Sequence, residues 1–352
     1  MSAFAINRTP LMTTFLIREL KAFRNDPIVI LDIGARGGID PEWRVFGDQL
    51  RVYCFEPDAV ECQRLAAGAS PQLTYIPRAL SRTLGTATLY QTGLAASTSL
   101  YQTRMDYFGR LLNRDNGVTV GQRTVEVSSL DDALAEYSVK SVDFIKLDTE
   151  GAELDILRGG RACLTEAVPL GVLSEVRFHE EINGSPPFAS LDSFLRKAGF
   201  RLYDLQFAYQ SRNALPYPGL ADYRKPSGER FFAYTTRGQM QDGDALYFRD
   251  LLLQDNRGIA QTVSAAKILK LCSLLEVYSF NDCAAELIQS CRARIDSIVE
   301  SSRLLDLLAS GIAGCMISYE DYMRSYFNNP VGVELNEPTT NRHKVSGPRI
   351  AG

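Results

Sequence analysis

Three carboxylates follow one another at the end of a largely apolar stretch in the middle of the chain. The stretch begins at Val142, and Asp148, Glu150 and Glu153 stand at its end, where a helical pattern starts. Such acids repel one another, so a cluster of this kind is costly unless cations, a helix N-terminus or a reaction offsets the repulsion. A helix N-terminus accounts for Glu153, but it accounts poorly for Asp148. The cluster is therefore a candidate site for chemistry.

A glycine-rich turn closes the first apolar run of the chain. The run Ile28–Ile33 ends at this turn, which consists of Gly34, Ala35, Arg36, Gly37 and Gly38. Glycines lack the Cβ atoms that would keep a ligand away from the backbone, and the start of the following helix presents free N–H groups to an anionic part of a ligand. The pattern is typical of a nucleotide-binding crevice, although a glycine here can also serve only to pack a helix on a strand.

A carboxylate ends the second apolar run, 22 residues beyond Gly34. The stretch Arg51–Glu56 is expected to be a strand, and Glu56 and Pro57 stand at its tip. An acid in this place can accept hydrogen bonds from both hydroxyls of a ribose, as in dinucleotide-binding folds. A solvated strand end would explain Glu56 if it stood alone. Together with the glycine turn, Glu56 predicts an adenosine-containing ligand.

The turn favours S-adenosylmethionine over a nicotinamide dinucleotide. A dinucleotide site uses G-x-G-x-x-G so that the pyrophosphate can lie against the backbone, and no second glycine follows Gly34 at the required position. S-adenosylmethionine has no phosphate but carries an ammonium group and a sulfonium, and Asp32 just before the turn suits the ammonium. An NAD-dependent oxidoreductase is therefore the weaker of the two enzyme hypotheses.

The overall composition is that of a soluble globular protein. The 352 residues are 45% hydrophobic and 23% charged, and a formal net charge of −4 gives no reason to expect nucleic acid as a partner. The longest strongly apolar stretch, Leu304–Ile317, is interrupted by Asp306 and is shorter than the roughly 20 residues that span a bilayer. The N-terminus lacks the features of a secretory signal, and the seven scattered cysteines show no metal-site spacing. We expect a cytoplasmic protein with reduced thiols.

Strand and helix patterns alternate from residue 28 to residue 237, which predicts an α/β domain with a mostly parallel sheet covered on both faces. Strands are expected at Ile28–Ile33, Arg51–Glu56, Thr74–Ala79, Val142–Asp148, Leu170–Val176, Arg201–Phe207 and Arg230–Thr235, with helices near 41–48, 58–68, 130–137, 152–165 and 189–198. Two additional strands, Gly85–Thr92 and Arg123–Val127, are expected to decorate this sheet.

The two ends of the chain differ from the sheet-forming part. Residues 1–27 are expected to be a helical lead-in, and residues 328–352 a mobile tail, because the tail is rich in Asn, Pro, Thr and Gly. Residues 238–327 are expected to be an all-helical appendage. Apolar residues recur there at three- and four-residue spacing in Ala245–Gln254, Thr262–Tyr278 and Asn281–Ala309. Such helices usually pack against the enzyme domain or a second subunit, so a homo-oligomer is a candidate assembly.

The succession of motifs resembles the FkbM family of S-adenosylmethionine-dependent methyltransferases. The motifs are Asp32–Gly38, Phe55–Pro57, Leu130–Asp132, Asp143–Glu153 and Leu157–Gly160, and the likeness covers about residues 28–236. The resemblance implies a class I methyltransferase sheet of seven strands. It also implies an O-methyltransferase that acts on a hydroxyl of a sugar, a glycan or a related natural product. Arg36 departs from the family, whose turn usually carries Asn at this position.

Methyl transfer from a sulfonium to an oxygen is an in-line displacement in which the hydroxyl must lose its proton. Asp148, at the carboxyl end of a strand beside the cofactor crevice, is the first candidate for the general base, and Glu150 belongs to the same acidic strand end. Glu175 ends the next strand, His179 follows it, and both are candidates to join the site. A divalent ion between Asp148 and Glu175 is the less favoured alternative, because the sequence shows no further ligand.

Two more segments are expected at the cofactor. Ser99 lies in the hydroxyl-rich stretch 95–100, and the resembling family has a Ser-rich loop near the cofactor, although a plain turn would explain the stretch as well. Ala79 and Leu80 end the third strand, where class I folds commonly meet the adenine. Asp148 is expected to contact the cofactor too. The remaining alternative is a non-catalytic scaffold that acts through its helices, which would predict loss of the acidic strand end.

Overall fold

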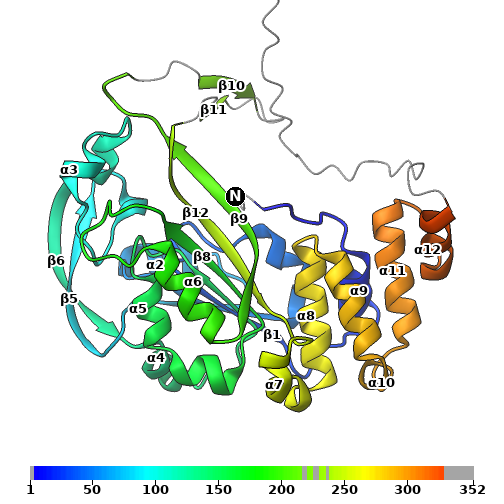
Figure 1. The fold of residues 1–352 in the computed structure, drawn as a ribbon. Coiled ribbons are helices and arrows are strands. Elements are labelled where there is room, and N and C mark those ends of the chain that lie inside the picture. The colour runs from blue at the N-terminus through cyan, green and yellow to red at the C-terminus, as the bar shows by residue number, and fades with distance from the viewer. Residues whose placement is uncertain (1–3, 216–219, 225–229, 235–237, 329–352) are drawn as a thin grey trace, which may run out of the picture. The chain divides into compact units, whose positions relative to one another are not determined.

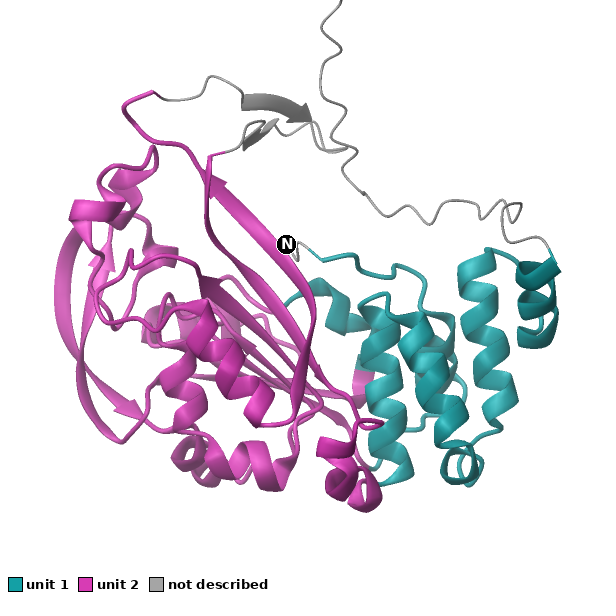
Figure 2. Ribbon diagram, in the orientation of Figure 1, with its two compact units in different colours: residues 1–25, 40–47, 264–352 teal, residues 26–39, 48–263 magenta. Residues whose placement is uncertain are grey.

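The computed structural model describes residues 4–215, 220–224, 230–234 and 238–328, and the chain divides into two compact units (Figures 1 and 2). One unit contains residues 26–39 and 48–263 and is built around β-sheets. The other is helical and draws on three parts of the chain, residues 1–25, 40–47 and 264–352. The predicted lead-in, as far as residue 25, and the predicted appendage, from residue 264 onward, thus fall in the same unit, whereas residues 238–263 of the predicted appendage belong to the sheet unit.

The main sheet contains seven of the described strands in the order β3-β2-β1-β7-β8-β12-β9. In this order they are Leu73–Ile76, Leu50–Phe55, Ile28–Ile33, Phe144–Leu147, Gly171–Arg177, Gln239–Arg249 and Phe200–Gln210. β12 pairs antiparallel with both of its neighbours, whereas the other pairs are parallel. A dinucleotide-binding sheet has the order 3-2-1-4-5-6, and here an antiparallel strand is inserted before the last one. The order confirms the predicted class I methyltransferase sheet.

The central strands are buried on both faces, which explains their nearly unbroken apolar sequences. Every residue of β1 is buried, and so are most residues of β7 and β8. The core on one face combines these strands with α4 (Leu130–Glu136), α5 (Glu153–Arg158) and α6 (Phe188–Lys197). Figure 1 shows α5 and α6 lying over this face. Because β1, β2, β7 and β8 are parallel, their carboxyl ends meet at one edge of the sheet.

The predicted additional strands are confirmed. β5 (Gly85–Thr92) and β6 (Thr119–Ser128) pair antiparallel, and β6 also pairs with the short β4 (Ala79–Leu80), giving a three-stranded sheet. The connection between β5 and β6 contains short helical turns, which are η2 (Ala95–Ser97), α3 (Met105–Phe108) and η3 (Arg114–Gly117). Helix α2 (Ala59–Ala66) begins where the Asp58 side chain accepts hydrogen bonds from two backbone N–H groups of its first turn.

The helix expected over Ala245–Gln254 is wrong, because this stretch continues β12 as far as Arg249. β12 lies between β8 and β9, and its successive residues 245–249 are all buried, so both faces of this part of the strand are covered and its sequence is a continuous apolar run at 245–248. Such a run cannot be told from a buried helix by periodicity alone. The seventh strand of the main sheet was expected at Arg230–Thr235. Residues 230–234 instead form β11 (Arg230–Tyr234), which pairs with β10 (Leu220–Arg224) in a separate sheet, and Thr235 lies outside the described residues.

The helix expected over residues 152–165 is interrupted. α5 ends at Arg158, and a π-helical turn, η4 (Cys163–Ala167), follows after Gly159 and Gly160. A Cβ on Gly159 would lie 2.7 Å from the carbonyl oxygen of Ser81, and one on Gly160 would lie 2.6 Å from the Leu130 side chain. The glycines therefore allow close packing against neighbouring segments at the point where the helix stops.

The helical unit joins sequence-distant segments through buried polar contacts. Its elements are α1 (Leu11–Arg18), most of η1 (Pro41–Gln49), α8 (Ala265–Val277), α9 (Asn281–Ser290), α10 (Arg292–Ile295), α11 (Ser301–Ala313) and α12 (Tyr319–Asn328). The Glu276 carboxylate accepts hydrogen bonds from Met12 N at 3.0 Å and from Thr13 N at 2.7 Å. The Trp43 indole N–H donates to the Tyr278 hydroxyl at 3.2 Å. α1 thus receives its N-terminal cap from a residue far away in sequence.

The last part of the sheet unit is also helical, with η5 (Gln254–Asn256) and α7 (Arg257–Thr262) after β12. Among the helices that the structure describes, none has the length and apolar character needed to cross a bilayer. The predicted mobile tail, residues 328–352, lies outside the described residues except for Asn328, the last residue of α12.

Candidate active site

The glycine turn after β1 lies against the ends of both neighbouring strands. Gly34 has a φ of +89°, and a Cβ at this position would lie 1.9 Å from the carbonyl oxygen of Asp148 after β7. The N–H groups of Gly34 and Ala35 donate to the carbonyl oxygen of Phe55 at 2.9 and 3.1 Å. Only glycine fits at the first position of the turn, because any side chain would collide with the backbone after β7.

Lys146 connects two of the predicted site residues. Its Nζ lies 3.3 Å from Oδ1 of Asp32, which is fully buried, and 3.7 Å from Oδ2 of Asp148, whose side chain is 49% exposed. Asp32 and Asp148 therefore share one cation at the carboxyl ends of β1 and β7. The sequence analysis missed this residue. The sequence feature that could have identified Lys146 is the presence of a lysine inside the otherwise apolar run of a central strand.

Glu56 is buried at the end of β2, close to the glycine turn. Its Oε1 accepts a hydrogen bond from Asp58 N at 2.8 Å, and Arg36 Nη1 lies 3.7 Å from the same oxygen. Burial raises the pKa of Glu56, and the Asp58 N–H and the Arg36 charge lower it. Pro57 follows, and its carbonyl oxygen accepts a hydrogen bond from Arg123 at 3.3 Å. The structure therefore brings Arg36 to the carboxylate that was predicted to bind the ribose.

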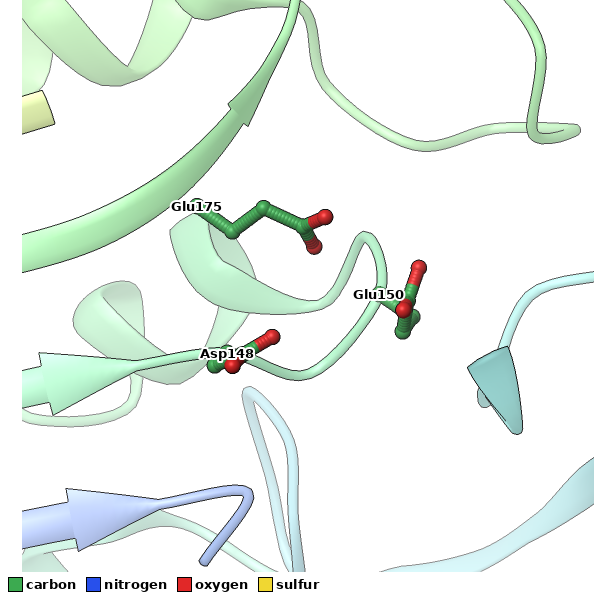
Figure 3. A group of neighbouring side chains, drawn as sticks. All are labelled: Asp148, Glu150 and Glu175. Carbon is green, nitrogen blue, oxygen red and sulfur yellow. The ribbon is translucent and has the colours of Figure 1, made fainter. Parts of the chain in front are cut away.

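The carboxylates of Asp148, Glu150 and Glu175 approach one another closely. Each offers one oxygen, and these oxygens all lie within 4.8 Å of one another. Figure 3 shows them coming from the end of β7, the loop that follows and β8, around a common space. Register explains part of this arrangement, since Leu147 pairs with Ser174 and the next residue along each strand is an acid. The predicted cluster is thus assembled from two adjacent strands.

Arg177 is the cation of this cluster, and the sequence analysis missed it. Its Nη2 lies in hydrogen-bond contact with Glu150 and 3.0 Å from Oε2 of Glu175. Its Nη1 donates to Oε1 of Glu181 at 2.6 Å, and Gln241 donates to the other oxygen of Glu181. The signal in the sequence was the spacing of Glu175 and Arg177, because residues two apart on a strand point to the same face.

Burial and crowding set the proton affinities of the cluster. Burial raises the pKa of Glu150 to about 7, against the lowering effect of the Arg177 charge. Burial also holds the pKa of Glu175 well above its usual range. Burial by itself would lower the pKa of Arg177, but the charges of Glu175 and Glu150 outweigh it and raise that pKa. The arginine therefore stays charged, while burial favours the protonated form of both glutamates.

The loop between β7 and α5 is fixed by hydrogen bonds on several sides. Glu150 has a φ of +58°, an uncommon conformation for a residue with a side chain. Oε1 of Glu153 accepts from Thr149 N at 2.9 Å and Gly151 N at 3.1 Å. The Ser99 hydroxyl donates to the carbonyl oxygen of Glu150 at 2.7 Å. Ser99 is therefore engaged in holding the acidic loop.

Three predicted site residues make their contacts elsewhere. Nε2 of His179 lies 2.8 Å from the carbonyl oxygen of Met240, and its ring stacks on Tyr107 at 5.6 Å between ring centres. Ala79 and Leu80 are buried in β4, and Leu80 packs into the main core. Any contact of these two residues with an adenine would have to use their backbone. The roles of all three stay predictions.

The comparisons with known proteins agree with the motifs. Residues 32–202 match the model of the methyltransferase FkbM domain, and the predicted resemblance is confirmed. S-adenosylmethionine is the methyl donor that goes with such a domain. The 2-O-methyltransferase NoeI of Sinorhizobium fredii (strain NBRC 101917 / NGR234) is 28% identical over 151 residues, which cover 40% of this chain and 60% of that protein. The match thus spans less than two thirds of the relative.

A solved structure is also similar to this chain. It is the 1,6-didemethyltoxoflavin-N1-methyltransferase of Burkholderia thailandensis, with bound 1,6-didemethyltoxoflavin and S-adenosylhomocysteine. The identity is 12%, the coverage is 69% of this chain and 79% of that one, and the TM-score is 0.28. At this TM-score we assign the fold from the strand order of the chain itself.

The residues at this edge of the sheet fit S-adenosylmethionine. Gly34 keeps the turn free of a side chain, Glu56 has a carboxylate of the kind that can accept hydrogen bonds from ribose hydroxyls, and the negative charges of Asp32 near the end of β1 and Asp148 after β7 suit an ammonium group and a sulfonium. The acidic cluster has the oxygen ligands that a divalent cation would use. However, Arg177 already supplies a positive charge between Glu150 and Glu175.

Proposed function

We propose that the chain is an S-adenosylmethionine-dependent O-methyltransferase that acts on a hydroxyl of a sugar, a glycan or a related natural product, with Asp148 as the general base. One observation carries this proposal. The half-exposed carboxylate of Asp148 follows β7 at the point where its backbone touches the Gly34 turn. A base at that point is close to the crevice in which sheets of this kind bind their ligand.

In this proposal, different residues act on the cofactor and on the acceptor. The cofactor supplies a methyl group on a sulfonium. Glu56 binds the ribose hydroxyls, and the Gly34 turn lets the backbone approach the ligand. Asp148 accepts the proton of the acceptor hydroxyl on its carboxylate while the new C–O bond forms and the C–S bond breaks. Lys146, whose Nζ lies 3.7 Å from Oδ2 of Asp148, places a positive charge beside this carboxylate and orients it.

Support for the acceptor class comes from the FkbM domain and from the name of the relative, a 2-O-methyltransferase. The acids at the site suit an acceptor that offers hydroxyl groups as hydrogen-bond donors. For the location of the enzyme we keep the expectation of the cytoplasm, which rests on the sequence.

Calorimetry with S-adenosylhomocysteine tests the cofactor site directly. The wild-type protein should bind it, and Glu56→Ala should weaken binding about tenfold or more, as expected for loss of a buried hydrogen-bonding carboxylate. Glu136→Ala, which removes an exposed carboxylate of the same unit, is the matched control. Absence of binding to the wild-type protein would favour the scaffold hypothesis. Transfer of labelled methyl to a panel of neutral sugars and glycans then tests the reaction.

A further inference from the structure

We propose that Arg177 is the permanent counter-ion of the acidic site, holding Glu150 and Glu175 in place and taking the position that a divalent cation would otherwise occupy. This inference rests on the proposed function for its chemical meaning. It makes Arg177 a positioning residue, because it acts on the carboxylates and not on the substrate. It further implies that methyl transfer by this chain needs no metal.

The geometry around Arg177 supports this role. Its side chain is only 8% exposed, and one nitrogen, Nη2, contacts both Glu150 and Glu175. A planar guanidinium can serve several carboxylates at once and remains charged at any pH that a protein tolerates. Without it, Glu150 and Glu175 would face each other and Asp148 with no shared cation on their side of the cluster. Lys146 pairs with Asp148 and Asp32 on the other side.

A second set of contacts holds Arg177 through its other terminal nitrogen, Nη1. Glu181 is fully buried and binds Nη1 of the arginine, and Gln241 binds Glu181 in turn. The backbone of Glu181 is also held, because its carbonyl oxygen accepts a hydrogen bond from Arg104 N at 2.8 Å. This support leaves Nη2 directed at the acidic site. A charge held on both sides in this way behaves as a fixed part of the site.

Manganese binding tests the proposal without cofactor or acceptor. Mn²⁺ alone is titrated into the protein and followed by electron paramagnetic resonance. Wild-type protein should show no Mn²⁺ site that depends on Glu175. Arg177→Met should gain one, because Glu150 and Glu175 then lose the cation between them, and oxygens of these two residues and of Asp148 lie within 4.8 Å of one another. Arg177→Met combined with Glu175→Gln should lose it, and Arg196→Met, which removes an exposed ion-paired arginine, should behave like wild type.

Rescue of activity separates positioning from general loss of structure. Arg177→Met should lower kcat at least tenfold, and added Mn²⁺ should restore part of it, whereas an arginine needed only for folding would not be replaced by an ion. A chelator should leave wild-type activity unchanged.

Two results would overturn the assignment. The first is a Mn²⁺ site in the wild-type protein that Glu175→Gln removes. This comparison does not require the Arg177→Met protein, so it tests the proposal even if that variant does not fold. The second is a folded Arg177→Met protein that binds no more Mn²⁺ than wild type. Failure of the proposed function would appear separately, as absence of S-adenosylhomocysteine binding in the calorimetric experiment.

Discussion

Glu276 in the helical unit and Glu150 in the sheet unit are both largely buried carboxylates, but their surroundings differ. The Glu276 carboxylate accepts hydrogen bonds from the backbone N–H groups of Met12 and Thr13 and from the hydroxyl of Thr13, the last at 2.6 Å. Glu150 has Arg177 as its cation but shares it with Glu175, and Asp148 adds a further negative charge. The donors around Glu276 compensate its burial, whereas the acids around Glu150 add to the cost.

The difference separates a structural carboxylate from a functional one. Glu276 caps α1, whose N-cap residue, Pro10, offers no side-chain hydrogen bond, so its value lies in stability. The crowded acids after β7 repel one another and are destabilising, and the proposed reaction would account for their presence. Substitutions in the two regions should therefore change different quantities. The predictions below test that separation.

Replacing the proposed base should have the largest effect. Asp148→Asn keeps the shape of the side chain but cannot accept the acceptor proton, so kcat should fall by about 10²- to 10⁴-fold. Thermal unfolding should change little, since the carboxylate is half exposed. The matched control, Asp255→Asn, alters an exposed acid of the same unit and should retain full activity. An Asp148→Asn enzyme with wild-type kcat would remove Asp148 from the proposed role.

Replacing the structural carboxylate should lower stability without lowering cofactor affinity. Glu276→Ala removes the side-chain acceptor of Met12 N and Thr13 N, and it leaves the Thr13 hydroxyl with only the carbonyl oxygen of Ser273 at 3.4 Å. We expect a loss of about 2–4 kcal/mol in the free energy of unfolding, measured in urea. The control substitution Glu286→Ala, at an exposed residue of α9, should change the free energy of unfolding by less than about 0.5 kcal/mol. A Glu276→Ala protein of unchanged stability that fails to bind cofactor would contradict the comparison.

The pH dependence of methyl transfer should reflect the ionisation of the Glu150 carboxyl group. Its pKa is raised to about 7, so the carboxyl keeps its proton below this pH and loses it above. If the ionised cluster is the active form, kcat should rise up to about tenfold per pH unit below pH 7 and level off above it. Glu150→Gln cannot ionise and should remove this break from the profile. A break near pH 7 that persists in Glu150→Gln would assign it to another group.

The smallest effect is expected at the turn. Arg36 departs from the family pattern and lies 3.7 Å from Glu56 and 3.5 Å from Asp58, with a third of its side chain exposed. Exposed ion pairs contribute at most about 1 kcal/mol, so Arg36→Asn should change the Kd of S-adenosylhomocysteine by no more than about fivefold. The difference should shrink in high salt. A larger, salt-independent change would show that Arg36 contacts the cofactor itself.

The sequence by itself determined the central sheet, the glycine turn and the acids at the strand ends. Apolar runs such as Ile28–Ile33 are long enough and sharply enough bounded to identify buried strands, and residues that follow parallel strands must meet at one edge. That rule alone placed Asp148 and Glu175 together, and the structure confirms their proximity. Local sequence was sufficient because both signals depend on positions along single strands.

Only the tertiary structure decided which charges oppose the acids and where the sheet ends. Arg177 and Lys146 acquire their partners through register between strands and through residues as distant as Gln241, and no local pattern records such contacts. β12 was mistaken for a helix because burial on both faces erases the alternation that marks a strand. Burial of a segment is a property of its neighbours in space, and these are fixed only when the chain folds.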